Sequence, residues 1–463
     1  MKKNIFSLKF FLITCCLYLV SCNVSPNPQT NTKEPANATR TKENKLSDEA
    51  LMDLVEERTF QYFWNGAEPN SGMACERIHT DGVYPQNDQT VVTSGGAGFG
   101  VMAILVGIKR GYITREEAVN RLEKITNFLE KADRFHGVWP HWMYGETGKV
   151  KPFSKKDDGG DLVETSFMAQ GLLCVRQYLK DGNEREKALA AKADELWKGI
   201  EWDWHRGADK ENVLFWHWSP NFAWDMNFRI RGYNECLITY VLAACSPTHG
   251  VPAEVYHEGW AEGGKIKDDL PEKYGYQLPL RHQAAPEFGG PAFWAHYSFL
   301  GLNPNGLKDQ YADYFDHNRK HILINRQFCI ENPNHFKGYS KDNWGITSSY
   351  SMKGYASHKP EQDLGVIAPT AALASIPYTP EYSMDAMRFF YEELGDTLMG
   401  PYGFYDAFSI QDNWFPRKYL AIDQGPIVVM IENHRSGMLW DLFMSCEEIQ
   451  NGLKKLGFEY KKS

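Results

Sequence analysis

Acidic residues recur near the starts of the apolar segments of this 463-residue chain: Asp157, Asp158, Asp161, Glu164, Glu235, Asp363 and Asp423. Each one alone is better explained by helix capping, because a carboxylate in a first turn accepts free N–H groups and offsets the helix dipole. Asp161 and Glu164, for example, have the spacing of a capping box. Their joint occurrence beside aromatic-rich loops nevertheless indicates an acid–base site.

Aromatic residues make up 14% of the chain, and several tryptophans lie in the loops that precede the acids. Two carboxyl groups in an aromatic cleft are typical of glycoside hydrolysis, in which one protonates the leaving oxygen and the other attacks the anomeric carbon or activates water. Flat sugar faces pack well on such rings, although we expect about half of the rings to be structural. The candidate substrate-binding rings are Trp139, Trp142, Trp216, Trp218, Trp224, Trp344 and Trp414.

The elements that must position these residues are predicted to be helices of two kinds. Amphipathic segments begin near Ser47, Thr114, Asp181, Asn305, Thr379 and Ser445, and more apolar segments begin near Ser94, Asp161, Tyr233, Pro291, Gln362 and Gly425. Helices that are apolar all round are usually buried. Six apolar helices alternating with six amphipathic ones predict an all-α fold, an (α/α)6 barrel in a single domain over residues 47–463. An α-solenoid is the alternative, but no residue signature recurs at a fixed period.

If the inner helices are parallel, all their N-termini lie at one end of the barrel, so the acids would gather at the mouth of one cavity.

The formal net charge of −9 disfavours nucleic acid and anionic membrane surfaces as partners. Gly98, Gly100 and Ala103 fit G-x-G-x-x-A without a surrounding βαβ unit, so we interpret them as close helix packing. His317 and His321 have metal-ligand spacing but lie in a charged segment, and we expect them at the surface. No metal or cofactor is predicted.

The N-terminal residues are typical of an exported lipoprotein. Lys2 and Lys3 precede an apolar run that ends in Leu19-Val20-Ser21-Cys22, a pattern that resembles the bacterial lipobox. We therefore expect a signal peptide over residues 1–21, a lipid on Cys22 and a flexible tether over residues 22–46. This predicts an outer-membrane-anchored protein that faces the periplasm. An ordinary signal peptide, which would release a soluble protein, is the alternative.

Four strings together resemble a known family: Arg58–Trp64 (RTFQYFW), Asp157–Glu164 (DDGGDLVE), Arg231–Glu235 (RGYNE) and Ala421–Pro426 (AIDQGP). They are similar to the bacterial glucoamylase-like domain group that contains glycoside hydrolase family 144, the β-1,2-glucan hydrolases. The resemblance extends from about Ser47 to the C-terminus. It implies an (α/α)6 barrel, an inverting mechanism without a metal requirement, and a neutral β-glucan as the substrate.

The same resemblance implies roles for individual residues. Glu235 matches a carboxylate proposed as the acid, Asp423 is the candidate base, and Asp161 is expected to take part in catalysis. Asp157 and Glu164 match acids of the substrate cleft, where they are expected to bind sugar.

The function predicted is hydrolysis of β-1,2-glucosidic bonds in linear β-1,2-glucan or sophoro-oligosaccharides, with sophorose or short oligosaccharides released in endo or exo mode. A polysaccharide lyase on the same barrel is the first alternative, disfavoured because lyases hold uronates with cationic groups. A non-catalytic glycan-binding lipoprotein is the second, and Glu235→Gln distinguishes it because a binding protein has no activity to lose.

Overall fold

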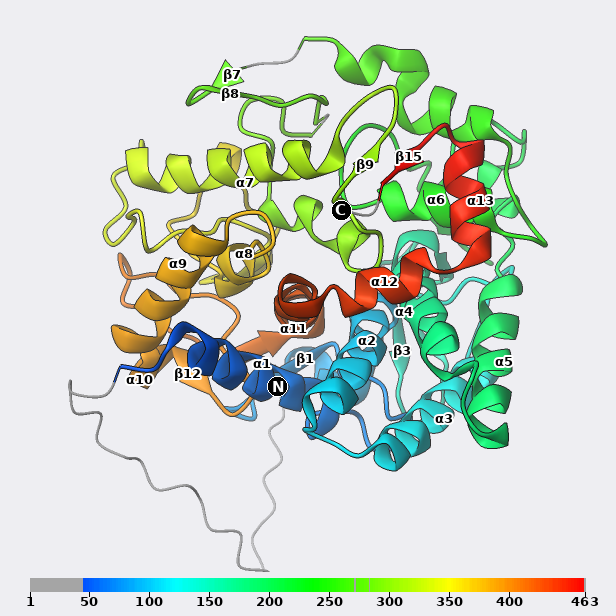
Figure 1. Ribbon diagram of the computed structural model, residues 1–463, viewed down its shortest axis with the longest axis horizontal. Coiled ribbons are helices and arrows are strands. Elements are labelled where there is room, and N and C mark those ends of the chain that lie inside the picture. Colours follow the sequence, from blue (N-terminus) through cyan, green and yellow to red (C-terminus); the bar gives the residue numbers. More distant parts are fainter. Residues whose placement is uncertain (1–44, 270–271, 283, 462–463) are drawn as a thin grey trace, which may run out of the picture. The chain divides into compact units, whose positions relative to one another are not determined.

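The computed structural model describes residues 45–461 apart from 270, 271 and 283 (Figure 1). The predicted signal peptide, Cys22 and nearly all of the predicted tether lie outside the described residues. Leu46–Ser463 form one compact unit. Within the described ranges, no helix combines the length and the apolar character needed to cross a bilayer.

The inner layer consists of apolar helices that pack against one another in a closed ring. In Figure 1, α2, α4, α8 and α11 lie near the middle of the fold, and α3, α5, α7 and α9 lie towards its edge. The helices α2 and α4 form the most extensive contact of the ring, and α11 packs on both α2 and α8. The inner elements are α2 (Ser94–Arg110), α4 (Leu162–Leu179), α6 (Leu237–Cys245), the 3-10 turns η5 (Ala292–Ala295) and η6 (Tyr297–Phe299), α8 (Pro369–Leu373) and α11 (Ala421–Ser436).

The outer layer consists mainly of amphipathic helices, and α1, α3, α5 and α7 begin at a residue whose side chain caps the first turn. Thr114 and Glu117 form a capping box at α3, and Asn183 and Glu186 form another at α5. The outer helices are α1 (Asp48–Trp64), α3 (Arg115–Lys131), α5 (Glu184–Lys198), α7 (Tyr314–Glu331), α9 (Pro380–Glu392) and α13 (Glu447–Lys455), with the shorter α10 (Gly395–Leu398) and α12 (Met438–Met444). The predicted (α/α)6 barrel is therefore confirmed.

Short strands, which the sequence patterns did not predict, lie directly before several inner helices. The strands β2, β5 and β14 end at the residues that precede α2, α4 and α11, so they fix where these helices begin. The paired strands are β1 (Arg77–His79) with β14 (Lys418–Leu420); β2 (Val91–Thr93) with β3 (Trp142–Tyr144), which pairs with β4 (Val150–Lys151); β5 (Gly160–Asp161) with β6 (His217–Trp218); β7 (Glu272–Lys273) with β8 (Tyr276–Gln277); β9 (Leu307–Lys308) with β15 (Glu459–Tyr460); β10 (Ser349–Ser351) with β11 (Gly354–Ala356); and β12 (Met399–Gly400) with β13 (Gly403–Phe404).

The inner elements on one side of the ring are shorter than predicted. The segment from Pro291 forms two 3-10 turns rather than one helix, and α8 begins only at Pro369, whose ring disfavours a helical conformation in the residue before it. The remaining helical turns are η1 (Pro85–Thr90), η2 (Trp204–Arg206), η3 (Val255–Trp260), η4 (Glu262–Lys267) and η7 (Pro360–Gln362).

His317 and His321 are fully buried, so the expectation that they lie at the surface is wrong. Both lie on α7, whose inner face carries His317 towards His282, His321 towards Gly290 and Asn318 towards Tyr233. The helix is charged only on its other face, so its overall composition conceals a polar inner face.

Candidate active site

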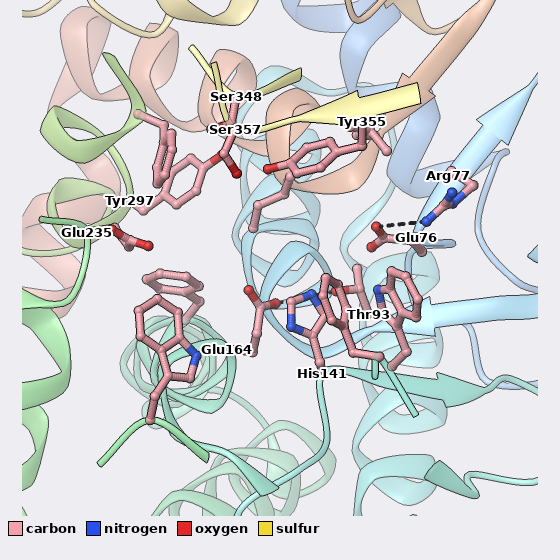
Figure 2. Close-up of a pocket in the computed structure, with 17 residues that line it drawn as sticks. Glu76, Arg77, Thr93, His141, Glu164, Glu235, Tyr297, Ser348, Tyr355 and Ser357 are labelled. Carbon is pink, nitrogen blue, oxygen red and sulfur yellow. Dashed lines mark hydrogen bonds and ion pairs between the residues drawn. The ribbon is translucent and has the colours of Figure 1, made fainter. Parts of the chain in front are cut away.

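A cavity of about 340 Å³ opens where the strands that precede the inner helices meet (Figure 2). Three carboxyl groups line it, those of Glu76, Glu164 and Glu235. In Figure 2, Glu235 and the Glu76–Arg77 pair lie on opposite sides of the cavity, and Glu164 lies between them. The other lining residues are Thr93, His141, Trp142, Phe153, Phe167, Trp216, Phe293, Tyr297, Ser348, Tyr355, Ser357, Leu420 and Ile422.

Glu235 lies in the turn just before α6 and is held by its main chain. The Ser298 hydroxyl donates a hydrogen bond to the Glu235 carbonyl oxygen and accepts one from the Ile238 N–H at 3.0 Å. Burial raises the pKa of Glu235 to about 7, with a smaller contribution from the charge of Glu164; a hydrogen bond from the Trp294 side chain opposes this shift. A carboxyl group with this pKa can be protonated at neutral pH, as a proton donor must be.

Glu164 and Asp161 share the first turn of α4 but differ in ionisation. Glu164 Oε2 accepts a hydrogen bond from the Gly95 N–H at 2.9 Å, and burial raises its pKa to about 7. Asp161 is fully buried and accepts hydrogen bonds from the N–H groups of Val163 and Glu164, both at 3.0 Å. Burial would raise the pKa of Asp161, but the hydrogen bond from His141 and the nearby imidazoles hold it below its usual value. Asp161 therefore remains ionised while Glu164 titrates near neutrality.

His141 supplies a positive charge next to these acids. Its Nδ1 lies 3.0 Å from Asp161 Oδ2. Burial acts to lower the His141 pKa, but the carboxylates of Glu164, Asp161 and Glu76 outweigh it and raise the pKa to about 10. His141 therefore carries a proton at neutral pH and neutralises part of the negative charge. It was not predicted, although it stands between Trp139 and Trp142 in a loop that was expected to contribute rings.

Glu76 also lies at the cavity without having been predicted. It precedes β1 by one residue, so no helix start marks it in the sequence. Its Oε1 lies 3.6 Å from Arg77 Nη2. Burial raises the pKa of Glu76, and the positive charges of Arg77 and His141 act against this shift.

Asp423 lies behind the cavity wall and is not one of the lining residues. It is 2% exposed, its Oδ1 lies 3.4 Å from the Tyr297 hydroxyl, and its carboxyl group lies beside that of Asp406. Burial, followed by the proximity of Asp406, raises the pKa of Asp423 well above the usual value, which favours its protonated form. Asp406 Oδ2 accepts a hydrogen bond from the Tyr350 N–H at 2.7 Å. Tyr297 thus separates this carboxyl pair from the cavity.

One set of described residues has the composition of a metal site. Ligand atoms of His141, Asp157 and Asp161 all lie within 4.8 Å of one another. His141 would have to lose its proton to bind a metal, and the carboxylates that raise its pKa to about 10 make this loss unfavourable. Asp157 lies beside His217, with 3.5 Å between Oδ2 and Nε2, and burial raises its pKa to about 7.

The predicted rings divide into three groups. Trp142 and Trp216 line the cavity. Trp139 and Trp344 are fully buried, and their indole N–H groups donate to main-chain carbonyls of Leu129 and Tyr382, so the expectation that these two rings bind substrate is wrong. They support the loops around the cavity instead. Trp218, Trp224 and Trp414 are partly buried and are not among the lining residues.

Known proteins resemble this chain over nearly all of the described residues. Residues 227–447 match the family described as "Putative glucoamylase". An endo-β-1,2-glucanase from Chitinophaga pinensis, solved with sophorotriose and glucose, is 66% identical with a TM-score of 0.88, and the match covers 90% of this chain and 99% of that one. A structure from Bacteroides caccae described as a putative glucoamylase is 62% identical with a TM-score of 0.88, covering 90% of this chain and all of that one.

A curated relative from Parabacteroides distasonis, an exo β-1,2-glucooligosaccharide sophorohydrolase acting at the non-reducing end, is 45% identical over 430 residues. This match covers 89% of the present chain but only 58% of the relative, which is the longer protein. An endo-β-1,2-glucanase from Talaromyces funiculosus is 11% identical with a TM-score of 0.66, covering 89% of this chain and 91% of that one, which is a likeness of fold alone.

Proposed function

Because the chain belongs to glycoside hydrolase family 144, we propose that it hydrolyses β-1,2-glucosidic bonds in linear β-1,2-glucan and its sophoro-oligosaccharides. The observation that most supports this is the cavity itself, in which Glu235 and Glu164, both with a pKa near 7, point towards one space between aromatic rings. A neutral glucan suits it, because the wall carries three carboxyl groups and its one arginine, Arg77, lies beside Glu76.

We assign the proton donor to Glu235 and the base to Glu164. Protonated Glu235 would donate to the leaving glucosidic oxygen while Glu164 takes a proton from the water that attacks the anomeric carbon, which inverts the configuration. Glu164 suits this step because Gly95 holds one of its oxygens and ionised Asp161 lies in the same turn. Asp423 is less suitable as the base because it lies behind Tyr297 and its pKa is raised well above the usual value. Each full cycle leaves Glu164 protonated and Glu235 ionised, and exchange with water restores both.

The test is to incubate the purified protein with linear β-1,2-glucan and follow the new reducing ends by proton NMR during the first minutes. We expect sophoro-oligosaccharides whose reducing ends appear first as the α-anomer. Initial β-anomer would contradict the assignment of an inverting mechanism. No product from this polymer, with release of sugar from an α-glucan instead, would contradict the function.

We further propose that cleavage is internal. Support comes from the endo-acting Chitinophaga pinensis enzyme, which is both more similar to this chain and matched over almost its whole length. Internal cleavage predicts a mixture of oligosaccharide lengths at the earliest time points. Sophorose as the sole early product would instead indicate an exo enzyme.

We also propose that lipidated Cys22 anchors the protein in the outer membrane, facing the periplasm. The support is the apolar run that ends in Leu19-Val20-Ser21-Cys22. Metabolic labelling with an alkynyl fatty acid should mark the wild-type protein in the membrane fraction but not the Cys22→Ala variant. Equal labelling of both would refute the assignment.

A further inference from the structure

We propose that Tyr233 and Trp294, supported by His282 and His317 beneath them, position the Glu235 carboxyl group for proton donation. This inference rests on the proposed function, since it assigns supporting residues to the acid. None of these four residues was predicted to act, and Tyr233 and Trp294 do not line the cavity. They are therefore positioning residues rather than catalytic ones.

Tyr233 is the fixed point of the turn that carries Glu235. Its side chain is 1% exposed, and its hydroxyl donates to Asn318 Oδ1 on α7 and lies 3.2 Å from the Trp294 carbonyl oxygen. Asn318 is held in turn, because its Nδ2 donates to the Tyr378 hydroxyl at 3.1 Å. A tyrosine bound in this way two residues before Glu235 restricts the main chain from which the carboxyl group projects.

Trp294 approaches Glu235 from the other side. Its carbonyl oxygen faces the Tyr233 hydroxyl, and its indole acts against the rise in the pKa of Glu235. Ser298, four residues further along the same segment, donates a hydrogen bond to the Glu235 carbonyl oxygen. Tyr233 and Trp294 therefore form a path that connects the main chain beside Glu235 to the 291–299 segment, and a shift of this segment would move the acid.

Two buried histidines pack beneath this path. The His282 ring stacks on Tyr233 at 4.5 Å and 19°, and the His317 ring lies 4.1 Å from Tyr233. His282 Nε2 and His317 Nε2 are 2.9 Å apart, and His282 Nδ1 lies 2.6 Å from the Gly289 carbonyl oxygen. Burial lowers the pKa of both histidines far below the usual value, so they form a neutral pair in which one ring donates to the other. Their rings fix Tyr233 without adding charge beside the acid.

The test compares two leaving groups, because a nitrophenolate departs without a proton whereas a sugar alkoxide needs one. The variants are Tyr233→Phe, which keeps the ring, and Trp294→Phe, which removes the indole N–H at the other end of the path. On β-1,2-glucan we expect kcat to fall roughly tenfold or more in each, with KM changed less than about twofold. On 4-nitrophenyl β-sophoroside the loss should be less than about threefold.

Equal losses on the two substrates, or full activity on glucan in both folded variants, would overturn the inference. If one variant does not fold, the other still decides. Tyr256→Phe is the matched control, since Tyr256 is equally buried and is hydrogen-bonded to Asp309 and Tyr314 but does not contact Tyr233 or Trp294. The ratio of the activities of this variant on the two substrates should equal that of the wild type. Glu235→Gln provides the reference: if it also lost both activities equally, the acid assignment itself would fail.

Discussion

The sequence alone does not distinguish the carboxyl groups in and around the cavity, and their surroundings give them different pKa values. Asp161 accepts two main-chain N–H groups and faces His141, so it is ionised, whereas burial and the neighbouring Asp406 raise the pKa of Asp423 and favour its protonated form. Glu235 and Glu164 fall between these extremes, with a pKa near 7. A site that must both give and take a proton needs residues of this intermediate kind.

We predict that the rate of glucan hydrolysis falls as pH rises above 7. Burial raises the pKa of Glu235 to about 7, so the protonated acid is lost on the alkaline side, by about tenfold for each further pH unit. Glu235→Gln should lower kcat by about 100- to 10,000-fold without unfolding the protein. The check is a pH–rate profile, with the exposed Glu381→Gln as the control. A rate that stays constant from pH 7 to 9 would contradict the role of Glu235.

The carboxyl groups of the cavity were predictable from sequence only where they coincided with the start of a helix. Glu164 and Glu235 stand at such positions and line the cavity. Glu76 and His141 each directly precede a three-residue strand, so neither periodicity nor capping marks them. Trp139 and Trp344 show the converse, because buried and sugar-binding tryptophans have the same local sequence pattern and only burial separates them.

At the scale of the elements, the alternation of apolar and amphipathic segments predicted the two layers because the inner helices of a barrel contact protein on every side. The pattern failed around residues 291–299 and 362–369, where the apolar runs are short and proline shifts the start of the helix. It failed also for α7, whose inner face is lined by histidine and asparagine. Hydrophobic periodicity cannot detect a polar face that is buried and hydrogen-bonded.

Close contact between α2 and α4 depends on glycine. A Cβ atom on Gly98 would lie 2.5 Å from the Met168 nitrogen and the Phe167 carbonyl oxygen, which are backbone atoms that cannot move aside independently. We predict that Gly98→Ala lowers the free energy of unfolding by about 1–3 kcal/mol and weakens activity, since α4 carries Glu164. Urea denaturation checks this. Gly199→Ala is the control, because φ there is −80° and the nearest atom would lie at 3.4 Å, and it should change stability by less than about 1 kcal/mol. Equal effects of the two substitutions would contradict the packing argument.

At the scale of the whole molecule, the ring closes where the first outer helix meets the last inner one. Arg435 on α11 forms ion pairs with three acids of α1: Glu49, Asp53 at 2.6 Å and Glu56 at 2.8 Å. Glu56 is fully buried, and Arg110 on α2 lies 3.6 Å from it. Burial raises the pKa of Glu56 to about 7, and the two arginines act to lower it. The closure of the barrel therefore contains a buried acid whose charge depends on Arg435.

We predict that Arg435→Met lowers the free energy of unfolding by about 3 kcal/mol, the lower end of the range for a broken buried ion pair, because Arg110 still faces Glu56. Without Arg435 the pKa of Glu56 rises further, so the penalty for its ionised form increases with pH. The deficit should therefore be larger at pH 8 than at pH 5 in urea titrations. Arg388→Met is the control, because Arg388 on α9 pairs with Asp48, an exposed acid of α1. It should lower the free energy of unfolding by less than about 1 kcal/mol at either pH. A deficit for Arg435→Met that matched this control, or that did not change with pH, would show that the buried acid does not depend on Arg435.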